Sequence, residues 1–463
     1  VVAAAPLAAQ AGAAVLAEGG TAFDAVVTMG LAETVLLPPK CGLAGDLVAI
    51  CLPAGASEPE ALLAIGGAPA GLAAVATSGA WREVGPTSVG PPAAAAGYLA
   101  LAARGRLPLE RLAGPAIRLA SDGFPWAGVC HQLSVQAARL VAEMHPEGCV
   151  YYPGGEPIVR GTIVRLPGLA AALHELVERR DRVLDGPLGE AIVAAVRARG
   201  GVLVPEDFGF ARAEWAPCAS GRAGPLPAWT TPAPTHGPSL LDAVARLGAT
   251  DDAGTAYRRV MAAITRRRTE LADPSGTSMV TAIDADGTVA VVVHSNSFPR
   301  FGSGIVVPEY DLPLANRAGR GFTPEPGHPN FPVPGRRPAT TLHAWMVADE
   351  AGEARLAGAT PGGANQMPWN AQLLGQIVAG VDDPGVLVTS PRWEWLPDDD
   401  GVRVEAGFAE TDVAAMREAA PRVAHTGRWG LKSAQQVVRL PRPGEAFTGA
   451  ADPRTVGLAL GVC

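Results

Sequence analysis

One junction in the sequence could carry covalent chemistry, and it lies between Gly276 and Thr277. Thr277 opens a strand-like run that continues to Ile283, and the turn 284–287 separates it from a second such run, Thr288–Ser295. Cleavage between the glycine and the threonine would make the threonine a new N-terminus. A hydroxyl nucleophile needs a base beside it, and an N-terminal threonine carries that base as its own α-amine. The junction therefore predicts a cleavage site that creates a catalytic residue.

A glycine pair could supply the second part of such a site. Gly362 and Gly363 lie in the sequence PGGAN at 361–365. Backbone N–H groups of glycine can approach a ligand closely, and such donors suit the oxyanion that develops when a carbonyl is attacked. The same pattern is also typical of a tight turn with no chemical role.

Two further groups of polar residues could complete the site. Ser295 and Asn296 end the second strand-like run, so their side chains could face the threonine at the start of the first run. Thr340 and Thr341 follow Pro338 and offer a pair of hydroxyl groups. The alternatives are a strand end entering a loop and a surface loop before a strand.

Cofactor and metal chemistry is not indicated. The sequence has no GxGxxG, P-loop, GxSxG or HExxH pattern, and its eight histidines show no ligand spacing. His174 and Glu175 resemble part of a metal motif, but they fall in an amphipathic helical pattern that is typical of a solvated face. We therefore expect no cofactor and no metal.

Composition indicates a globular protein that binds neither nucleic acid nor a membrane. Hydrophobic residues make up 48% and charged residues 18%. The net charge is −8 and the longest basic cluster is 266–268, whereas phosphate binding needs a positive patch. No apolar run approaches the roughly 20 residues of a membrane span. Six irregularly spaced cysteines favour reduced thiols and a cytoplasmic location; a removed targeting segment is the alternative.

Helical patterns dominate the first 200 residues, and strand patterns follow the junction. Helices are predicted at 8–18 and at 21–31, where Thr21 could be the cap, and amphipathic helices at 107–120, 166–180 and 188–199. Beyond the hairpin 277–295, short strands are predicted at 354–356 and 386–388, a helix at 372–378, and a proline-rich loop that lines a pocket at 319–338. Helices mainly in the first part and hairpins in the second suggest a layered α+β fold.

These features occur together and in the order found in the γ-glutamyltransferase family of N-terminal-nucleophile hydrolases, which the chain resembles over nearly its full length. The segment EGGTAFD at 18–24 resembles that family's GGNAVDA signature, and Thr277 with 283–287 resembles its nucleophile hairpin. Further matches lie at 42–46, 120–125, 301–306, 337–338, 361–363 and 452–454. Within the family, 295–296, 314–317 and 326–330 look closest to the cephalosporin-acylase-like and amidohydrolase branch.

The resemblance implies a four-layer αββα sandwich made from one precursor. Cleavage would give a large subunit, 1–276, and a small subunit, 277–463, which stay together as a heterodimer and could pair further into a dimer of heterodimers. The substrate is expected to be a small molecule with a carboxylate or acyl group.

The resemblance also implies residue roles. Thr277 would be both the autoprocessing residue and the nucleophile, and Gly362 and Gly363 would donate to the oxyanion. Ser295 stands where the family has a threonine that hydrogen-bonds the nucleophile, and Asn296 follows it as a substrate-binding candidate. The pair Thr340 and Thr341 stands where the family has serines that hold a substrate carboxylate.

Two departures change the expected substrate. The family's glutamyl transferases grip a carboxylate with an arginine in the segment matching 64–69, which has no basic residue here, and bind an ammonium with an aspartate that 316–321 lacks. A buried ammonium without a carboxylate partner loses on the order of 2–5 kcal/mol, so glutathione is a poor candidate. Arg317 or Arg320 could bind an anionic acyl group instead, with surface arginines as the alternative.

These expectations favour an autoprocessed hydrolase that cleaves an amide, of an acyl, glutaryl or γ-glutamyl-like type, through an acyl-enzyme. One alternative keeps the nucleophile but cleaves a C–C bond, as relatives do in actinobacterial antibiotic pathways that make alkylproline units. The other alternative is a non-catalytic binding homologue.

Overall fold

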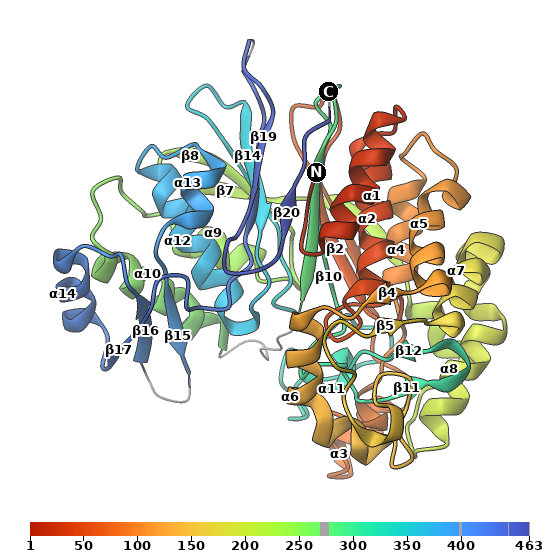
Figure 1. The fold of residues 1–463 in the computed structure, drawn as a ribbon. Coiled ribbons are helices and arrows are strands. Elements are labelled where there is room, and N and C mark those ends of the chain that lie inside the picture. Colours follow the sequence, from red (N-terminus) through yellow and green to blue (C-terminus); the bar gives the residue numbers. More distant parts are fainter. Residues whose placement is uncertain (269–276, 398–400, 443, 463) are drawn as a thin grey trace.

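Two β-sheets packed face to face form the centre of the molecule, and helices cover both outer sides (Figure 1). The structure, a computed structural model, describes residues 1–268, 277–397, 401–442 and 444–462. Within these ranges one sheet has the strand order β20-β1-β9-β10-β2-β3-β6, and the other has the order β19-β18-β14-β13-β8-β7. This arrangement confirms the predicted four-layer αββα sandwich.

The first sheet contains the predicted hairpin at its centre. Its strands are β1 (Val2–Ala3), β2 (Asp46–Leu52), β3 (Glu60–Ala64), β6 (Ala213–Pro217), β9 (Ser278–Ile283), β10 (Val289–Ser295) and β20 (Leu458–Ala459). Side chains alternate between its faces, because successive residues of a strand point to opposite sides. Met279 and Val293 belong to the core between the sheets, whereas Val280 and Val292 pack against the helices.

Helices from the first part of the chain cover this sheet. They are α1 (Pro6–Ala17), α2 (Ala22–Leu36), α4 (Ala94–Ala102), α5 (Leu109–Asp122), α7 (Pro167–Arg179) and α8 (Pro187–Arg197), with α6 (Gly128–Met144) and the short α3 (Leu72–Thr77) beside them. Thr21 caps α2 as the sequence predicts, since its side chain and that of Asp24 form a reciprocal capping box. Every residue of α2 is buried, because it lies between the sheet and the outer helices.

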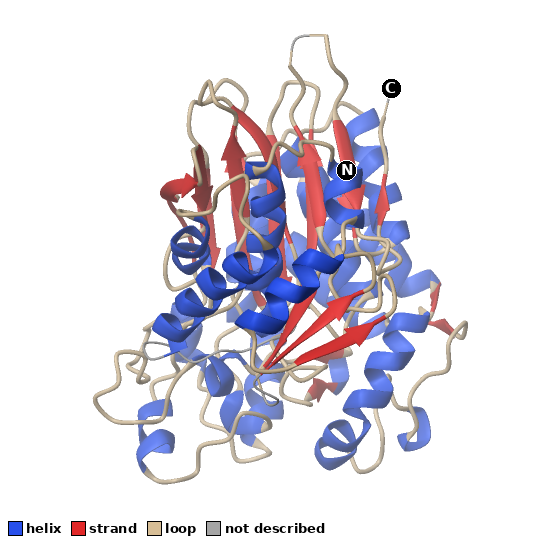
Figure 2. Cartoon of the chain, turned by 90° about the vertical axis from the view of Figure 1, so that its left-hand side faces the viewer, coloured by secondary structure: helices blue, strands red, loops and turns tan. Residues whose placement is uncertain are grey.

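The second sheet carries its own helical layer (Figure 2). Its strands are β7 (Ala219–Ala223), β8 (Leu226–Thr230), β13 (Trp345–Ala348), β14 (Ala354–Ala359), β18 (Gln436–Arg439) and β19 (Thr448–Ala451). The helices are α9 (Gly237–Val244), α10 (Ala253–Arg268), α12 (Gln366–Val378), α13 (Pro384–Thr389) and α14 (Glu410–Ala419). A small sheet of β15 (Trp393–Leu396), β16 (Gly401–Glu405) and β17 (Val423–Thr426) flanks them.

The remaining short elements lie in connections. They are β4 (Phe124–Pro125), β5 (Ile163–Val164), β11 (Val306–Val307), β12 (Leu312–Pro313) and α11 (Arg317–Gly321). The proline-rich stretch 319–338 begins in α11, contrary to the prediction for 319–321, and is a loop from residue 322, as predicted. None of the helices in the described part of the chain combines the length and apolar character that crossing a membrane requires.

Residues on both sides of the predicted cleavage junction contribute to both sheets. In the first sheet β9 lies between β1 and β10, and in the second sheet β8 pairs with β13. Any two fragments cut at the junction would therefore share two continuous hydrogen-bonded sheets.

Candidate active site

Thr277 directly precedes β9 and is 1% exposed. In the antiparallel pairing of β9 with β10, Ser278 lies opposite His294, so one further step brings Thr277 opposite Ser295. Ser295 in turn pairs with Asp46, the first residue of β2. Paired residues on neighbouring strands point to the same face. The register thus places the threonine, the serine and the aspartate in a row at one end of the sheet, facing the second sheet.

Gly276, the other residue of the predicted junction, lies outside the described residues.

The glycine pair forms the entry to α12. Gly362 has a φ of 147° and Gly363 a φ of 60°, values that favour glycine. A Cβ on Gly362 would lie 2.2 Å from the Trp369 ring, so no side chain fits there. Gly363 begins the single 3₁₀ turn Gly363–Asn365, which continues into α12. N–H groups at such a start have no partner within the helix and can receive an anionic oxygen.

Gln366, the first residue of α12, was not singled out from the sequence, yet it contacts the predicted nucleophile. Its Nε2 donates to Thr277 Oγ1 at 2.9 Å, and its side chain is fully buried. This hydrogen bond joins the turn after β14 in the second sheet to the start of β9 in the first. The only signal in the sequence is a glutamine shortly after the glycine pair, in a stretch that is otherwise largely apolar.

Ser295 and Asn296 are held tightly beside the glycine-rich turn that precedes β2. Ser295 Oγ accepts from the backbone N–H of Ser297 at 2.8 Å. Asn296 Nδ2 donates to the Pro38 carbonyl at 3.3 Å. A Cβ on Gly45 would lie 2.3 Å from the Ser295 carbonyl oxygen, so only glycine lets the turn approach this closely. The two segments that resemble family motifs therefore meet at the site.

Thr340 and Thr341 are buried just ahead of β13. Trp345, which opens β13, pairs with Gly358 near the end of β14, so the two threonines lie at the same end of the second sheet as the glycine pair. Thr340 Oγ1 accepts from the Leu342 N–H at 3.2 Å. Their contact with a substrate carboxylate stays a prediction.

The two candidate arginines have different surroundings. Arg317 is 4% exposed, and its Nε donates to Asp46 Oδ2 at 2.6 Å. Asp46 Oδ1 also accepts from the Gly66 N–H at 3.1 Å. Burial raises the pKa of Asp46, and the Arg317 charge opposes this rise. Arg320 instead pairs with Glu83, which is largely exposed. Of these two arginines, only Arg317 is attached to the row that contains Thr277.

Gly66, inside the segment 64–69, has no space for a side chain. A Cβ on Gly66 would lie 1.9 Å from the Pro91 carbonyl oxygen, so the segment has no room for a side chain at that position. Asp46 binds the N–H of this glycine and the arginine together. A positive charge therefore reaches this part of the site from α11.

Several buried polar atoms in the segments that flank this row lack hydrogen-bond partners among the described residues. They are Asn296 Oδ1, Ser297 Oγ, Arg300 Nε, Asn316 Oδ1, Arg317 Nη1 and Gln366 Oε1. Buried polar groups without partners are costly and therefore rare in native proteins. Gln366 contacts Thr277 and Arg317 contacts Asp46 through another atom of the same side chain, so unused polar atoms are attached to both ends of the row.

One buried group of potential metal ligands, Glu33 with Cys41 and His294, lies on the opposite face of the sheet. Glu33 already accepts hydrogen bonds from Ser278 Oγ at 2.6 Å and from His294 Nε2 at 3.0 Å, as well as from two backbone N–H groups of residues 4 and 5. His294 Nδ1 is engaged by the Tyr98 hydroxyl at 2.6 Å. The carboxylate and the imidazole are thus satisfied by hydrogen bonds that fix the start of β9, and we assign no metal to them.

Comparison with known proteins gives full-length matches. The sequence model of the gamma-glutamyltranspeptidase family matches residues 8–266 and 250–462. The oxamate amidohydrolase proenzyme of Klebsiella pneumoniae is 27% identical over 98% of this chain and 97% of its own length. The acylase ACY 1 proenzyme of Pseudomonas sp. strain V22 is 27% identical over 99% of this chain and 92% of its own.

A solved structure shares the fold. The cephalosporin acylase from Bacillus halodurans superposes with a TM-score of 0.87 at 24% identity, over 99% of this chain and 94% of that one.

Proposed function

Because this chain belongs to the gamma-glutamyltranspeptidase family of N-terminal-nucleophile enzymes, we propose that it is an autoprocessed hydrolase that cleaves an amide with Thr277 as the nucleophile. The observation that carries this proposal is the buried contact of Thr277 Oγ1 with Gln366, at the start of the helix that Gly362 and Gly363 precede.

The proposed reaction needs only groups of this chain and water. After cleavage of the bond to Gly276, the α-amine of Thr277 takes the proton from Oγ1, which attacks the substrate carbonyl. The N–H groups of Gly362 and Gly363 donate to the oxyanion. The ammonium then protonates the leaving amine, and an ester to Thr277 remains. Water, deprotonated by the same amine, hydrolyses this ester and releases the acid. An α-amine has an ordinary pKa of roughly 7.7–8.0, so it can act as a base near neutral pH.

The mature protein would be a heterodimer of 1–276 and 277–463. The interleaved strands of both sheets support this proposal, since each fragment completes the other's hydrogen bonds. The relatives named as proenzymes support the processing step. A cytoplasmic location stays a prediction from the cysteine spacing.

The proposed substrate is a small amide whose acyl group carries a carboxylate. Arg317, held by Asp46, would bind this anion, and Thr340 and Thr341 would be hydrogen-bond donors to the same ligand. Because Arg320 already pairs with Glu83, we assign it no direct role. No carboxylate in 316–321 could receive an ammonium, which disfavours glutathione.

Intact mass and denaturing gels of the purified protein test the proposal. We expect two fragments, with the smaller beginning at Thr277, and release of amine from a panel of glutaryl, oxamyl and glutamyl amides. A Thr277→Ala variant should stay as one chain of 47.2 kDa and be inactive. A wild-type chain that is active without cleavage would contradict the mechanism, and equal activity of both proteins would favour a binding homologue. The alternative that makes alkylproline units predicts a pyrroline intermediate as substrate. Loss of a carbon fragment from that intermediate, without amide hydrolysis, would favour C–C cleavage.

A further inference from the structure

The backbone that carries Gln366 is held rigidly by the small flanking sheet. Asn365 Nδ2 donates to the Trp395 carbonyl at 3.0 Å, and the Trp395 N–H donates back to Asn365 Oδ1 at 2.8 Å. One turn further along α12, Trp369 Nε1 donates to the Trp393 carbonyl at 3.0 Å. These bonds tie the first turn of the helix to β15, so the glutamine side chain extends from a fixed point toward the start of β9.

The two ends of the Gln366 amide are used differently. Nε2 donates to Thr277 Oγ1, whereas Oε1 is buried and has no hydrogen-bond partner among the described residues. A buried acceptor without a partner costs free energy, and an amide oxygen can accept two hydrogen bonds. An unused acceptor therefore lies on the same planar group that holds the predicted nucleophile.

The direction of the existing hydrogen bond suits a nucleophile. Because Nε2 is the donor, Thr277 Oγ1 is the acceptor and keeps its own proton available for a base. The same N–H favours the negative charge that grows on Oγ1 as this proton leaves. If the amide were reversed, the hydroxyl would donate to Oε1 and its proton would be occupied.

Cleavage of the bond before Thr277 supplies what Oε1 lacks. A peptide nitrogen carries one hydrogen, whereas a free amine carries two and an ammonium three. These new donors belong to the residue whose hydroxyl already contacts the amide. We propose that Gln366 positions the mature nucleophile with both ends of its side chain, Nε2 donating to Oγ1 and Oε1 accepting from the α-amine of Thr277. This inference rests on the proposed function and adds a residue to its site.

The inference predicts opposite pH effects for two substitutions of similar size. An acceptor favours the protonated amine, so its removal in Gln366→Met should move the acidic limb of the kcat profile to lower pH. In Gln366→Glu an ionised carboxylate favours the ammonium more strongly, so the limb should move to higher pH. Both variants lose the donor to Oγ1. We expect kcat to fall about 100-fold or more in each, with KM within about threefold, because the lost bonds act mainly in the transition state.

Processing has to be separated from turnover in this experiment. Residues 1–276 are therefore coexpressed with 277–463 behind an initiating methionine, which cells remove before a small residue, so that the mature heterodimer forms without self-cleavage. Gln376→Met is the matched control, because Gln376 lies on the same helix and also has an amide oxygen without a partner among the described residues. It should keep the wild-type kcat and pH profile.

Wild-type kcat in Gln366→Met, or a shift of the limb in the same direction in both variants, would overturn the inference. Failure of the proposed function looks different: the wild-type chain would then stay uncleaved, or Thr277→Ala would be as active as the wild type. A Gln366→Met heterodimer that does not assemble leaves the isosteric Gln366→Glu variant to decide, by the direction of its pH shift.

Discussion

At the scale of single residues, the proposal of an anionic substrate depends most on the pair formed by Arg317 and Asp46. Both side chains are almost fully buried, and their charges compensate each other. A buried charge without a partner is strongly unfavourable, so each residue requires the other. The remaining Nη1 group has no partner among the described residues. Asp46 lies two strands from Thr277, roughly 10 Å at the usual strand spacing, which places this donor within reach of a small ligand bound to the nucleophile.

We therefore expect Arg317→Lys to weaken binding of anionic substrates. Lysine keeps the charge but cannot bind Asp46 and a second carboxylate in a forked geometry. KM for an amide with a carboxylate in its acyl group should rise about 10- to 100-fold, while kcat changes little and KM for a neutral acyl amide stays the same. Steady-state kinetics with the two amides measure this. Arg320→Lys, at the arginine that pairs with Glu83, is the control and should leave both KM values unchanged.

The sequence nominates some residues of the candidate site and not others, for a geometric reason. Thr277 and Ser295 lie at the two ends of one hairpin, so the short turn at 284–287 fixes their register locally. Gln366 lies 89 positions after Thr277 in the sequence and contacts it from the side of the second sheet. No local pattern encodes a contact of that kind. The charge of Arg317 makes it a candidate in the sequence. Whether Arg317 or Arg320 belongs to the candidate site depends on which carboxylate each side chain reaches.

At the scale of elements, the start of β9 is anchored on the face opposite Thr277. Ser278 points toward the helices, where its hydroxyl donates to the buried Glu33 carboxylate of α2 at 2.6 Å. The same carboxylate accepts from His294 in β10. The anchor joins β9, β10 and α2 directly behind Thr277, so it would hold the N-terminus that the proposed cleavage creates.

Ser278→Ala should therefore loosen the start of β9, next to Thr277. A hydrogen bond to a charged group contributes roughly 1.5–3 kcal/mol, and its loss should lower the free energy of unfolding by about that amount. We also expect faster hydrogen exchange at the first residues of β9, measured by mass spectrometry. Thr281→Val is the control on the same strand, since its hydroxyl makes only a long contact of 3.4 Å with Gln436. Equal exchange in the two variants would contradict the anchoring role.

Elements with a clear local signal were predicted correctly, whereas one ambiguous apolar run was assigned to the wrong structure. Thr21 and Asp24 form the capping box that starts α2, and this signal needs no tertiary information. The predicted strand at 386–388 is wrong, because these residues lie in α13. Asp383 caps that helix by accepting from the Val386 N–H at 2.9 Å, and Pro384 occupies its first position. A short apolar run fits either structure, and here the cap decides.

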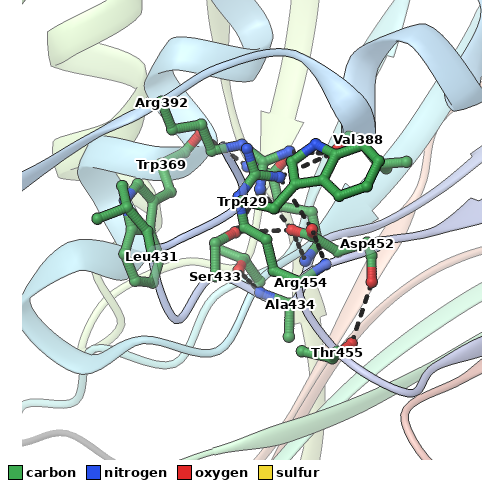
Figure 3. A network of polar contacts seen from close by, with 12 residues as sticks. Trp369, Val388, Arg392, Trp429, Leu431, Ser433, Ala434, Asp452, Arg454 and Thr455 are labelled. Carbon is green, nitrogen blue, oxygen red and sulfur yellow. Dashed lines mark hydrogen bonds and ion pairs between the residues drawn. The ribbon is translucent and has the colours of Figure 1, made fainter. Parts of the chain in front are cut away.

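At the scale of the whole molecule, a buried ionic network joins distant segments of the C-terminal part of the chain (Figure 3). Asp452 binds Arg392 through Oδ2 and Arg454 through Oδ1, the latter at 2.9 Å, and Glu405 completes the network through Arg454. The Asp452 carboxylate also accepts from the Gln435 N–H at 3.1 Å. The side chain of Gln435 donates to the Trp369 carbonyl at 2.9 Å. The network thus connects the C-terminal segment to α12, the helix that follows the glycine pair.

Asp452→Asn should be strongly destabilising. It removes one negative charge from a group of four buried ionic side chains and leaves Arg392 and Arg454 with Glu405 as the remaining carboxylate of that group, a change that costs about 3–5 kcal/mol. Urea unfolding followed by tryptophan fluorescence measures it. Asp382→Asn is the control, because Asp382 also pairs with two arginines but is half exposed. That substitution should cost no more than about 1 kcal/mol. Similar losses in the free energy of unfolding of the two variants would show that the buried network contributes no more to stability than the half-exposed pairs of Asp382.

The topology at this scale is beyond the reach of local patterns. In the first sheet β1 pairs with both β9 and β20, so residues near 2, 280 and 459 lie side by side. The sequence predicts layers of helices and strands, and the family resemblance supplies the αββα order. Which strands pair depends on the burial of apolar faces between segments far apart in the sequence. Many strands have similar apolar faces, so the local pattern does not identify the partner.

The whole molecule should also lose stability in mild acid, because two buried histidines must stay neutral. Burial lowers the pKa of His145 and of His343 to about 4. His145 Nε2 accepts from the Val306 N–H at 2.9 Å, and His343 Nε2 accepts from Asn370 Nδ2 at 2.8 Å. Protonation would place a second hydrogen against each donor. The folded pKa lies below the unfolded value, so the unfolded chain binds more protons between pH 6.5 and 4.

The free energy of unfolding should therefore be highest above about pH 6.5 and fall as pH drops toward 4, by up to about 1.4 kcal/mol per pH unit for each histidine. Other carboxyl groups titrate in the same range, so the contribution of one histidine is isolated by comparison. In His145→Gln an amide oxygen can accept from the Val306 N–H without binding a proton. Urea unfolding at pH 7, 5.5 and 4.5 should show that the free energy of unfolding declines less steeply with falling pH in this variant than in the wild type. The difference in slope should be close to the contribution of one bound proton. Parallel declines in the two proteins would show that His145 is protonated equally in the folded and unfolded chains.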